Sequence, residues 1–172
     1  ILTVAIQNRT LVKEKVAKEF LTKELEVAGK IQEQLLISDF SVFPELDIYG
    51  LNLAHHGVGG DFFDVVKKDN GSLFFCIADV SGKGIGAAIL MANLQAKFRS
   101  LCAQYNDLAT IVKELNSSLY SIVEGDKFVT FFVVRVDLPT HTFAYINAGH
   151  NYPIWIQRNE MTRLDQGCML LG

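Results

Sequence analysis

The chain has 172 residues, of which 49% are hydrophobic and 20% are charged, and its formal net charge is -3. These values predict one globular domain and exclude a disordered chain, a nucleic-acid binder that relies on positive charge and a membrane-spanning segment. The 3 cysteines lack metal-type spacing and no signal peptide is evident, so we expect reduced thiols and a cytoplasmic location.

Residues from about 10 to 36 predict a long amphipathic helix with Thr10 as its N-cap. At ~1.5 Å per residue it would span roughly 40 Å, a length that suits a connector as well as a helix packed on its own domain. Glu24 and Gln32 interrupt the heptad pattern, so a coiled coil is allowed but not required. The apolar stripe consists of Leu11, Val12, Val16, Phe20, Leu21, Leu25, Ala28, Ile31 and Leu35.

The residues after this helix alternate between strand and helix patterns. We expect three strands, then two helices, then four strands, and the blocks of strands favour an antiparallel α+β fold over alternating βαβ units. Asp107 is the expected N-cap of the second helix. The expected strands cover 46–55, 61–66, 72–78, 127–137, 143–149, 153–157 and 161–165, and the helices cover 85–105, which should be largely buried, and 107–123.

Two aspartates stand at equal distances from a predicted hairpin turn. Asn70-Gly71 is a strong turn signal, and Asp61 and Asp79 each lie nine residues from Asn70. A regular register would bring both carboxylates to the same end of adjacent strands. Two carboxylates without a cationic neighbour favour a hard divalent cation, and Gly59 and Gly60 would let the backbone and water approach it. The alternative is a turn followed by an edge strand, with no site.

The other motifs are weaker candidates for a functional site. The sequence "GKGIGA", with Gly82, Gly84 and Ala87, satisfies a loose nucleotide-binding pattern, but no acidic residue follows at the distance that a ribose requires. His55 and His56 are adjacent and would face opposite ways in a strand. We expect Lys83 to be solvated, although a phosphate contact is the alternative, and His150 suits a hydrogen-bonded turn equally well.

Several motifs occur together in an order that resembles a known family. They are "VGGDFFD", "ADVSGKGIGAAILM", "FVTFF", "NAGHN" followed by Pro153, and the final "LLG". Over about 28–172 the chain resembles the SpoIIE/RsbU-type bacterial serine phosphatases, a branch of the PPM (type-2C) phosphatases. The resemblance implies an α-β-β-α sandwich of antiparallel sheets, incomplete here. It also implies a division into residues 1–36, the end of an upstream sensor with its linker helix, and the phosphatase domain, 37–172.

The resemblance also assigns the site. Asp61 and Asp79 would be metal ligands, together with the backbone carbonyl of Val80, for two Mn²⁺ or Mg²⁺ ions that activate the attacking water. Ser81 stands where eukaryotic relatives have a histidine, so a histidine general acid at that position is absent. The supporting residues would be Gly60, Asp64 in an outer-shell or structural role, Ser81, Gly82, His150 and Asn151.

The family's further metal aspartates would lie downstream of residue 172, so we expect these 172 residues alone to bind metal weakly and to have little or no activity. The expected substrate is a phosphoserine on an anti-anti-sigma-like STAS protein, and the expected partners are an upstream sensor domain and a second copy, which would pair through the N-terminal helix or an exposed sheet edge. The alternative is a non-catalytic phosphatase-like module that serves interaction or dimerisation.

Overall fold

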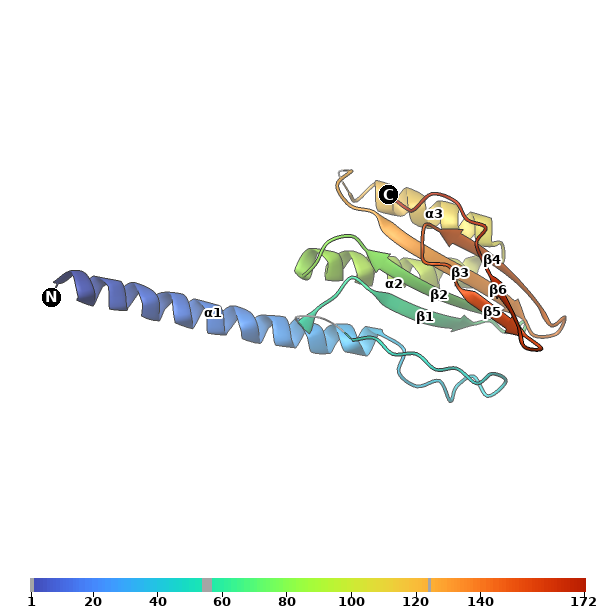
Figure 1. The fold of residues 1–172 in the computed structure, drawn as a ribbon, viewed down its shortest axis with the longest axis horizontal. Coiled ribbons are helices and arrows are strands. Elements are labelled where there is room, and N and C mark those ends of the chain that lie inside the picture. Colours follow the sequence, from blue (N-terminus) through green and yellow to red (C-terminus); the bar gives the residue numbers. More distant parts are fainter. Residues whose placement is uncertain (1, 54–56, 124) are drawn as a thin grey trace.

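The computed structural model describes residues 2–53, 57–123 and 125–172 (Figure 1). The chain begins with one long helix, continues through a hairpin and two helices, and ends with four strands. The elements are α1 (Leu2–Leu35), β1 (Phe62–Lys67), β2 (Ser72–Val80), α2 (Ile85–Gln104), α3 (Leu108–Tyr120), β3 (Val129–Asp137), β4 (Thr142–Ala148), β5 (Ile154–Gln157) and β6 (Glu160–Arg163).

The domain is organised around an antiparallel sheet with the strand order β1-β2-β3-β4. The turn between β1 and β2 is the predicted one, because Gly71 has φ 81° and the Asn70 Oδ1 accepts a hydrogen bond from the Ser72 N–H at 3.0 Å. Phe62 pairs with Ala78, so the hairpin has the regular register that its sequence predicts. The antiparallel α+β fold is confirmed.

Helices α2 and α3 cover one face of this sheet (Figure 1). The opposite face carries a small cluster around Phe43, Val65 and Leu73, covered by the segment that follows α1. Among the described residues the only strands outside the main sheet are β5 and β6, which form a hairpin of their own, so a full second sheet is not present. The main core is built from residues that include Phe62, Phe74, Met91, Phe98, Ile111, Leu115, Phe131 and Val133.

Three expectations about the elements are wrong. Residues 46–53 form no strand, because no neighbouring strand pairs with them. Tyr49 and Leu53 face solvent (86% and 81% exposed), whereas Leu46 and Ile48 pack against the small cluster on this face of the sheet. Thr10 lies inside α1, which is already helical at Leu2, so it is not at the N-cap position of this helix. Helix α2 buries one side only, since Ile85 and Ile89 lie on its open side.

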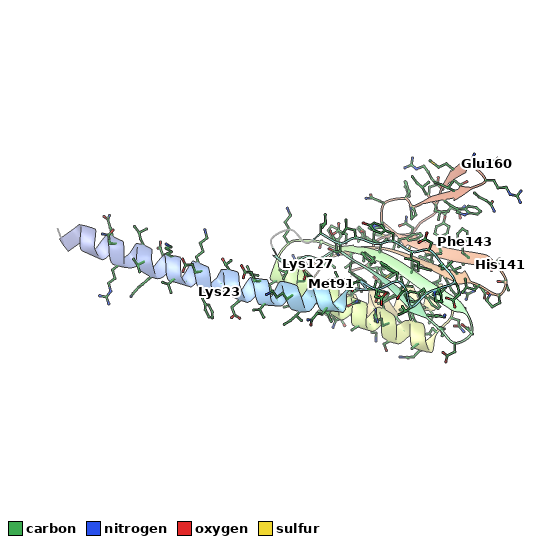
Figure 2. The ribbon with its side chains drawn as sticks, turned by 90° about the horizontal axis from the view of Figure 1, so that it is seen from below. Lys23, Met91, Lys127, His141, Phe143 and Glu160 are labelled. Atoms are coloured by element: carbon green, nitrogen blue, oxygen red, sulfur yellow. The ribbon has the colours of Figure 1, made fainter. Side chains whose placement is uncertain are left out.

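Helix α1 extends away from the domain for most of its length (Figures 1 and 2). Lys23 lies on this extended part, with no other element beside it (Figure 2). Only its C-terminal part is anchored, through Gly29, the buried Gln32 and a hydrogen bond from Gln95 Nε2 on α2 to the Leu35 carbonyl. None of the described helices has the length and the apolar character that a membrane crossing requires.

Candidate functional site

Asp61 and Asp79 lie at one end of the β1–β2 hairpin. Phe62 pairs with Ala78, and the next residues outward in this register are the two aspartates. Their carboxyl groups are close enough to interact directly. The pKa of Asp61 rises to about 6, first because its carboxyl is partly desolvated and then because Asp79 accepts its hydrogen bond and repels its negative charge. The hairpin therefore places two mutually repelling carboxylates at one point.

Both carboxylates line two cavities. One, of about 780 Å³, is lined by Asp61, Asp79 and the loop 81–84. The other, of about 300 Å³, is lined by the same two aspartates together with His150 and Asn151. A ligand held by the carboxylates would thus face the loop before α2 on one side and the bend after β4 on the other.

The Val80 carbonyl lies against Gly60, directly beside Asp61. A Cβ on Gly60 would stand 2.8 Å from the Val80 carbonyl oxygen, closer than packed atoms allow, and 3.2 Å from the Ala87 Cβ, which is tighter than most contacts. The glycine is therefore needed for close packing of the backbone against β2 and α2. This close approach brings the Val80 carbonyl to the same end of the sheet as the two carboxylates.

The loop between β2 and α2 is held in shape by Ser81. Its backbone N–H donates to the Phe128 carbonyl and its Oγ accepts from the Phe128 N–H, both at 2.9 Å. Gly82 has φ 95°, a conformation that strains any other residue. The Lys127 ammonium lies over this glycine, at the end of the sheet nearest α1 (Figure 2). Lys83 is exposed but lines the larger cavity.

Asp64 is separate from this site. Its side chain is fully buried, and its two oxygens accept hydrogen bonds at 2.6 Å from Nε and an Nη of Arg99 on α2. It also accepts from the Val65 N–H. The negative charge of Asp64 is therefore balanced within the protein by Arg99, and its assignment as an outer-shell or structural residue stays a prediction.

Gln32 is a contact that the sequence pattern did not predict. It interrupts the apolar stripe of α1, yet its side chain is 8% exposed and bonds both backbone groups of Gly59 at 2.8 Å. A Cβ on Gly29, one turn earlier, would collide with the Gly57 carbonyl. The two residues attach α1 to the loop that leads into Asp61. The sequence did carry a signal for this contact, which was a polar residue in the middle of an apolar stripe.

His150 is fixed beside the carboxylates by two residues that the sequence did not single out. The buried side chain of Asn147 accepts from the His150 N–H at 2.8 Å and donates to its carbonyl at 3.1 Å. The imidazole Nδ1 lies 2.8 Å from Oγ1 of Thr130, and Thr130 is the β3 partner of Asp79. Burial lowers the pKa of His150, and the charge of Asp79 opposes this shift.

The remaining candidates do not form sites of their own. Gly82 and Gly84 of "GKGIGA" precede α2, but β2 is antiparallel to both of its neighbours, whereas a dinucleotide-binding unit requires parallel strands. His55 and His56 lie outside the described residues. The three cysteines are free, with Cys76 and Cys102 buried and Cys168 exposed.

Comparison with known sequences gives consistent matches. The family model for stage II sporulation protein E (SpoIIE) matches residues 69–172. The phosphoserine phosphatase RsbU of Bacillus subtilis (strain 168) is 30% identical over 145 residues, which cover 84% of this chain and 43% of RsbU. The phosphoserine phosphatase RsbP of the same organism is 28% identical over 137 residues, 77% of this chain and 34% of RsbP. The chain thus spans less than half the length of these relatives.

Solved structures share the fold. The SiaA-PP2C domain of Pseudomonas aeruginosa matches with a TM-score of 0.74 and 20% identity, covering 91% of this chain and 64% of that one. The RsbU and RsbW domains of Rv1364c from Mycobacterium tuberculosis match with a TM-score of 0.59 and 26% identity over 67% of this chain and 32% of that one. The first similarity bears on the fold alone.

Proposed function

Since this chain belongs to the SpoIIE family, as a phosphatase domain of the SpoIIE/RsbU type within the PPM class, we propose that it is the metal-dependent catalytic core of a protein-serine phosphatase. The observation that carries the proposal is the contact between the Asp61 and Asp79 carboxyls at one end of the hairpin; partial desolvation and this contact together raise the pKa of Asp61 to about 6. Such a pair is unfavourable by itself and becomes favourable once a cation lies between the two charges.

The donor atoms fit Mn²⁺ or Mg²⁺. Asp61 and Asp79 supply carboxylate oxygens and Val80 supplies a carbonyl oxygen, and hard divalent cations prefer oxygen ligands. When bound, the ions would activate the attacking water and neutralise charge on the phosphoryl group. The protein's own part is to hold the ligands at the sheet end, through the β1–β2 register and the tight contact of Gly60 with Val80.

For these 172 residues alone we propose weak metal binding and little turnover. Within residues 2–53, 57–123 and 125–172, no group of three or more His, Cys, Asp and Glu side chains could hold a metal ion. Two carboxylates and one carbonyl are three ligands, which leaves half of the positions around a six-coordinate ion to water. A tight Mn²⁺ isotherm by calorimetry, together with turnover of a phosphoserine peptide by residues 1–172, would contradict this.

For the substrate we propose a phosphoserine on a small anti-anti-sigma-like STAS protein. Two relatives are named phosphoserine phosphatases, and one similar solved structure joins an RsbU domain to an RsbW domain. We further propose that residues 1–36 link the phosphatase domain to a sensor and to a second copy, because α1 extends far beyond the domain (Figure 1).

One observation favours the alternative, an interaction module without catalysis. The extended part of α1 carries a row of apolar side chains that are 59–66% exposed: Leu11, Val12, Val16 and Phe20. A partner helix would cover such a row. The two functions differ in their dependence on Asp79, since an interaction module would keep its binding partner when this carboxylate is removed.

The deciding experiment compares carboxylate variants of the full-length protein that carries these residues. Hydrolysis of a phosphoserine peptide would be followed with Mn²⁺, with Mg²⁺ and with EDTA, for the wild type, Asp61→Asn and Asp79→Asn. Asp47→Asn, an exposed carboxylate of the segment after α1, is the matched control. We expect metal-dependent turnover in the wild type and the control only. Equal turnover with EDTA, or in all four proteins, would contradict a metal-dependent phosphatase.

A further inference from the structure

His150 is the one imidazole among the described residues that lines a cavity together with the Asp61–Asp79 pair. Hydrogen bonds hold both its backbone and its ring. Asn147, which is 2% exposed, binds both backbone groups of His150, and Gly149 makes the preceding bend with φ 70°. The ring is then held through Nδ1 by Thr130. A side chain that only closed a turn would not need its ring tethered to the strand that neighbours Asp79.

The hydrogen bond to Thr130 determines which ring nitrogen of His150 is free to contact a ligand. Nδ1 is 2.8 Å from the Thr130 Oγ1, whereas Nε2 has no hydrogen-bond partner within the part of the chain that the structure describes. A phosphoryl oxygen carries negative charge, and a ring nitrogen that meets it is favoured when it carries hydrogen, because its lone pair would be repelled by that charge. In that arrangement the Thr130 hydroxyl donates to Nδ1, and Nε2–H is a free donor.

We propose that His150 contacts the substrate by donating a hydrogen bond from Nε2 to a non-bridging phosphoryl oxygen of the phosphate monoester, with Thr130 as the residue that positions the ring. This inference rests on the proposed phosphatase function and deepens it. The sequence lacks a histidine at position 81, directly after the Asp79-Val80 pair. The fold supplies one from the end of β4, on the other side of the carboxylates.

The ring itself provides a readout that does not depend on activity. In ¹⁵N-labelled protein, the imidazole resonances of His150, assigned by their loss in His150→Gln, should show the tautomer with hydrogen on Nε2. Adding inorganic phosphate in the presence of Mg²⁺ should shift the Nε2 resonance, and Thr130→Val should let the tautomer change. Hydrogen on Nδ1 in the wild type, or an Nε2 resonance that phosphate leaves unmoved, would overturn the proposal.

Kinetics of the full-length protein supply the second readout. His150→Leu, which has no donor, should lower kcat/KM about tenfold to a hundredfold, the range for a hydrogen bond to a charged group. Because the contact is to the phosphoryl group, the loss should be similar for a phosphoserine peptide and for p-nitrophenyl phosphate, and inhibition by inorganic phosphate should weaken in parallel. A loss confined to the peptide would overturn the proposal, because it would place the histidine at the leaving group or the peptide chain.

Conservative variants distinguish the loss of the hydrogen-bond donor from damage to the fold. His150→Gln retains an N–H donor near the position of Nε2 and should recover most of the loss, and Thr130→Ser should recover what Thr130→Val loses. His141→Asn, at the opposite end of the sheet (Figure 2), is the control and should behave as wild type. If the wild type hydrolyses neither substrate with any metal, the proposed function fails, and the response of the ring resonance to phosphate still decides this inference.

Discussion

Asp61 and Asp64 belong to the same short segment, yet the protein treats their charges in opposite ways. Asp64 faces α2, is fully buried and has both oxygens bonded to Arg99. Asp61 faces the cavities, is partly open to water and, among the residues that the structure describes, has the Asp79 carboxyl as its charged neighbour. The protein therefore neutralises the aspartate that stabilises its core and leaves the other to be neutralised from outside. An uncompensated pair of carboxylates at the end of two strands is the signature of the site.

Asp79→Asn should have the largest effect on function. The substitution removes one of the two charges that would hold the cations, and metal ions contribute several kcal/mol to this kind of catalysis, so we expect at least about a 1,000-fold loss of metal-dependent turnover. The fold should persist, because Asp79 is exposed and forms no ion pair with any residue that the structure describes. Turnover and the circular dichroism spectrum together check this. Turnover close to the wild-type value would mean that metal-dependent catalysis does not need Asp79, and the contrast between Asp61 and Asp64 would then have no bearing on function.

Arg99→Leu should have the largest effect on stability. It leaves the buried Asp64 carboxylate without its partner, and breaking such a pair costs about 3 kcal/mol of unfolding free energy. Urea unfolding measures the loss. The double variant Asp64→Leu with Arg99→Leu should be less destabilised than Arg99→Leu alone, because it buries no unpaired charge. If the double variant is the less stable of the two, Asp64 has a role beyond this ion pair.

Gln32→Met should have a smaller effect, on the attachment of α1. The substitution keeps the volume but removes both hydrogen bonds to the Gly59 backbone, so we expect a loss of about 1–3 kcal/mol in unfolding free energy. Gln34→Met, on the exposed side of the same helix turn, is the matched control and should be neutral. Equal stability of the two variants would mean that the Gly59 contact contributes nothing.

The sequence predicted what depends on local pattern and register. The Asn70-Gly71 turn fixes the pairing of β1 with β2, and this register alone brings Asp61 to Asp79. The Asp107 cap is likewise a local signal: its side chain accepts from the Thr110 N–H, as expected. The metal ligation itself stays a prediction, because it concerns a group that would bind between these residues.

What the sequence could not predict depends on contacts between distant segments. Arg99 is 35 positions from Asp64, and Gln32 is 27 from Gly59, so no spacing rule connects them. The predicted strand over 46–55 has a suitable alternating pattern, but a strand also needs a partner, and residues 46–53 have none. Thr130 escaped notice for the same reason, since its importance comes only from pairing with Asp79 and contacting His150.

The smallest predicted effect concerns pH and the metal-free protein. The pKa of Asp61 is about 6 in the folded state and ~3.9 for an unfolded aspartate, so the folded state binds the proton more tightly. The contribution of this group to stability is therefore fully present below about pH 4 and is lost as the pH rises through 6. Because Asp61 is exposed and water screens the repulsion, we expect a change of roughly 1 kcal/mol or less.

Asp79→Asn isolates this effect, because it removes the repulsion and leaves the other titrating groups in place. Measured by urea unfolding in EDTA, the variant should gain stability relative to wild type at pH 7.5 and show a smaller gain at pH 5. Asp79 also raises the pKa of His150, so both proteins should carry His150→Gln to remove that second contribution. A difference that is the same at both pH values would mean that the two carboxylates do not repel each other in the folded protein. The contrast between Asp61 and Asp64 would then reduce to one of burial, with no mutual repulsion for a cation to relieve.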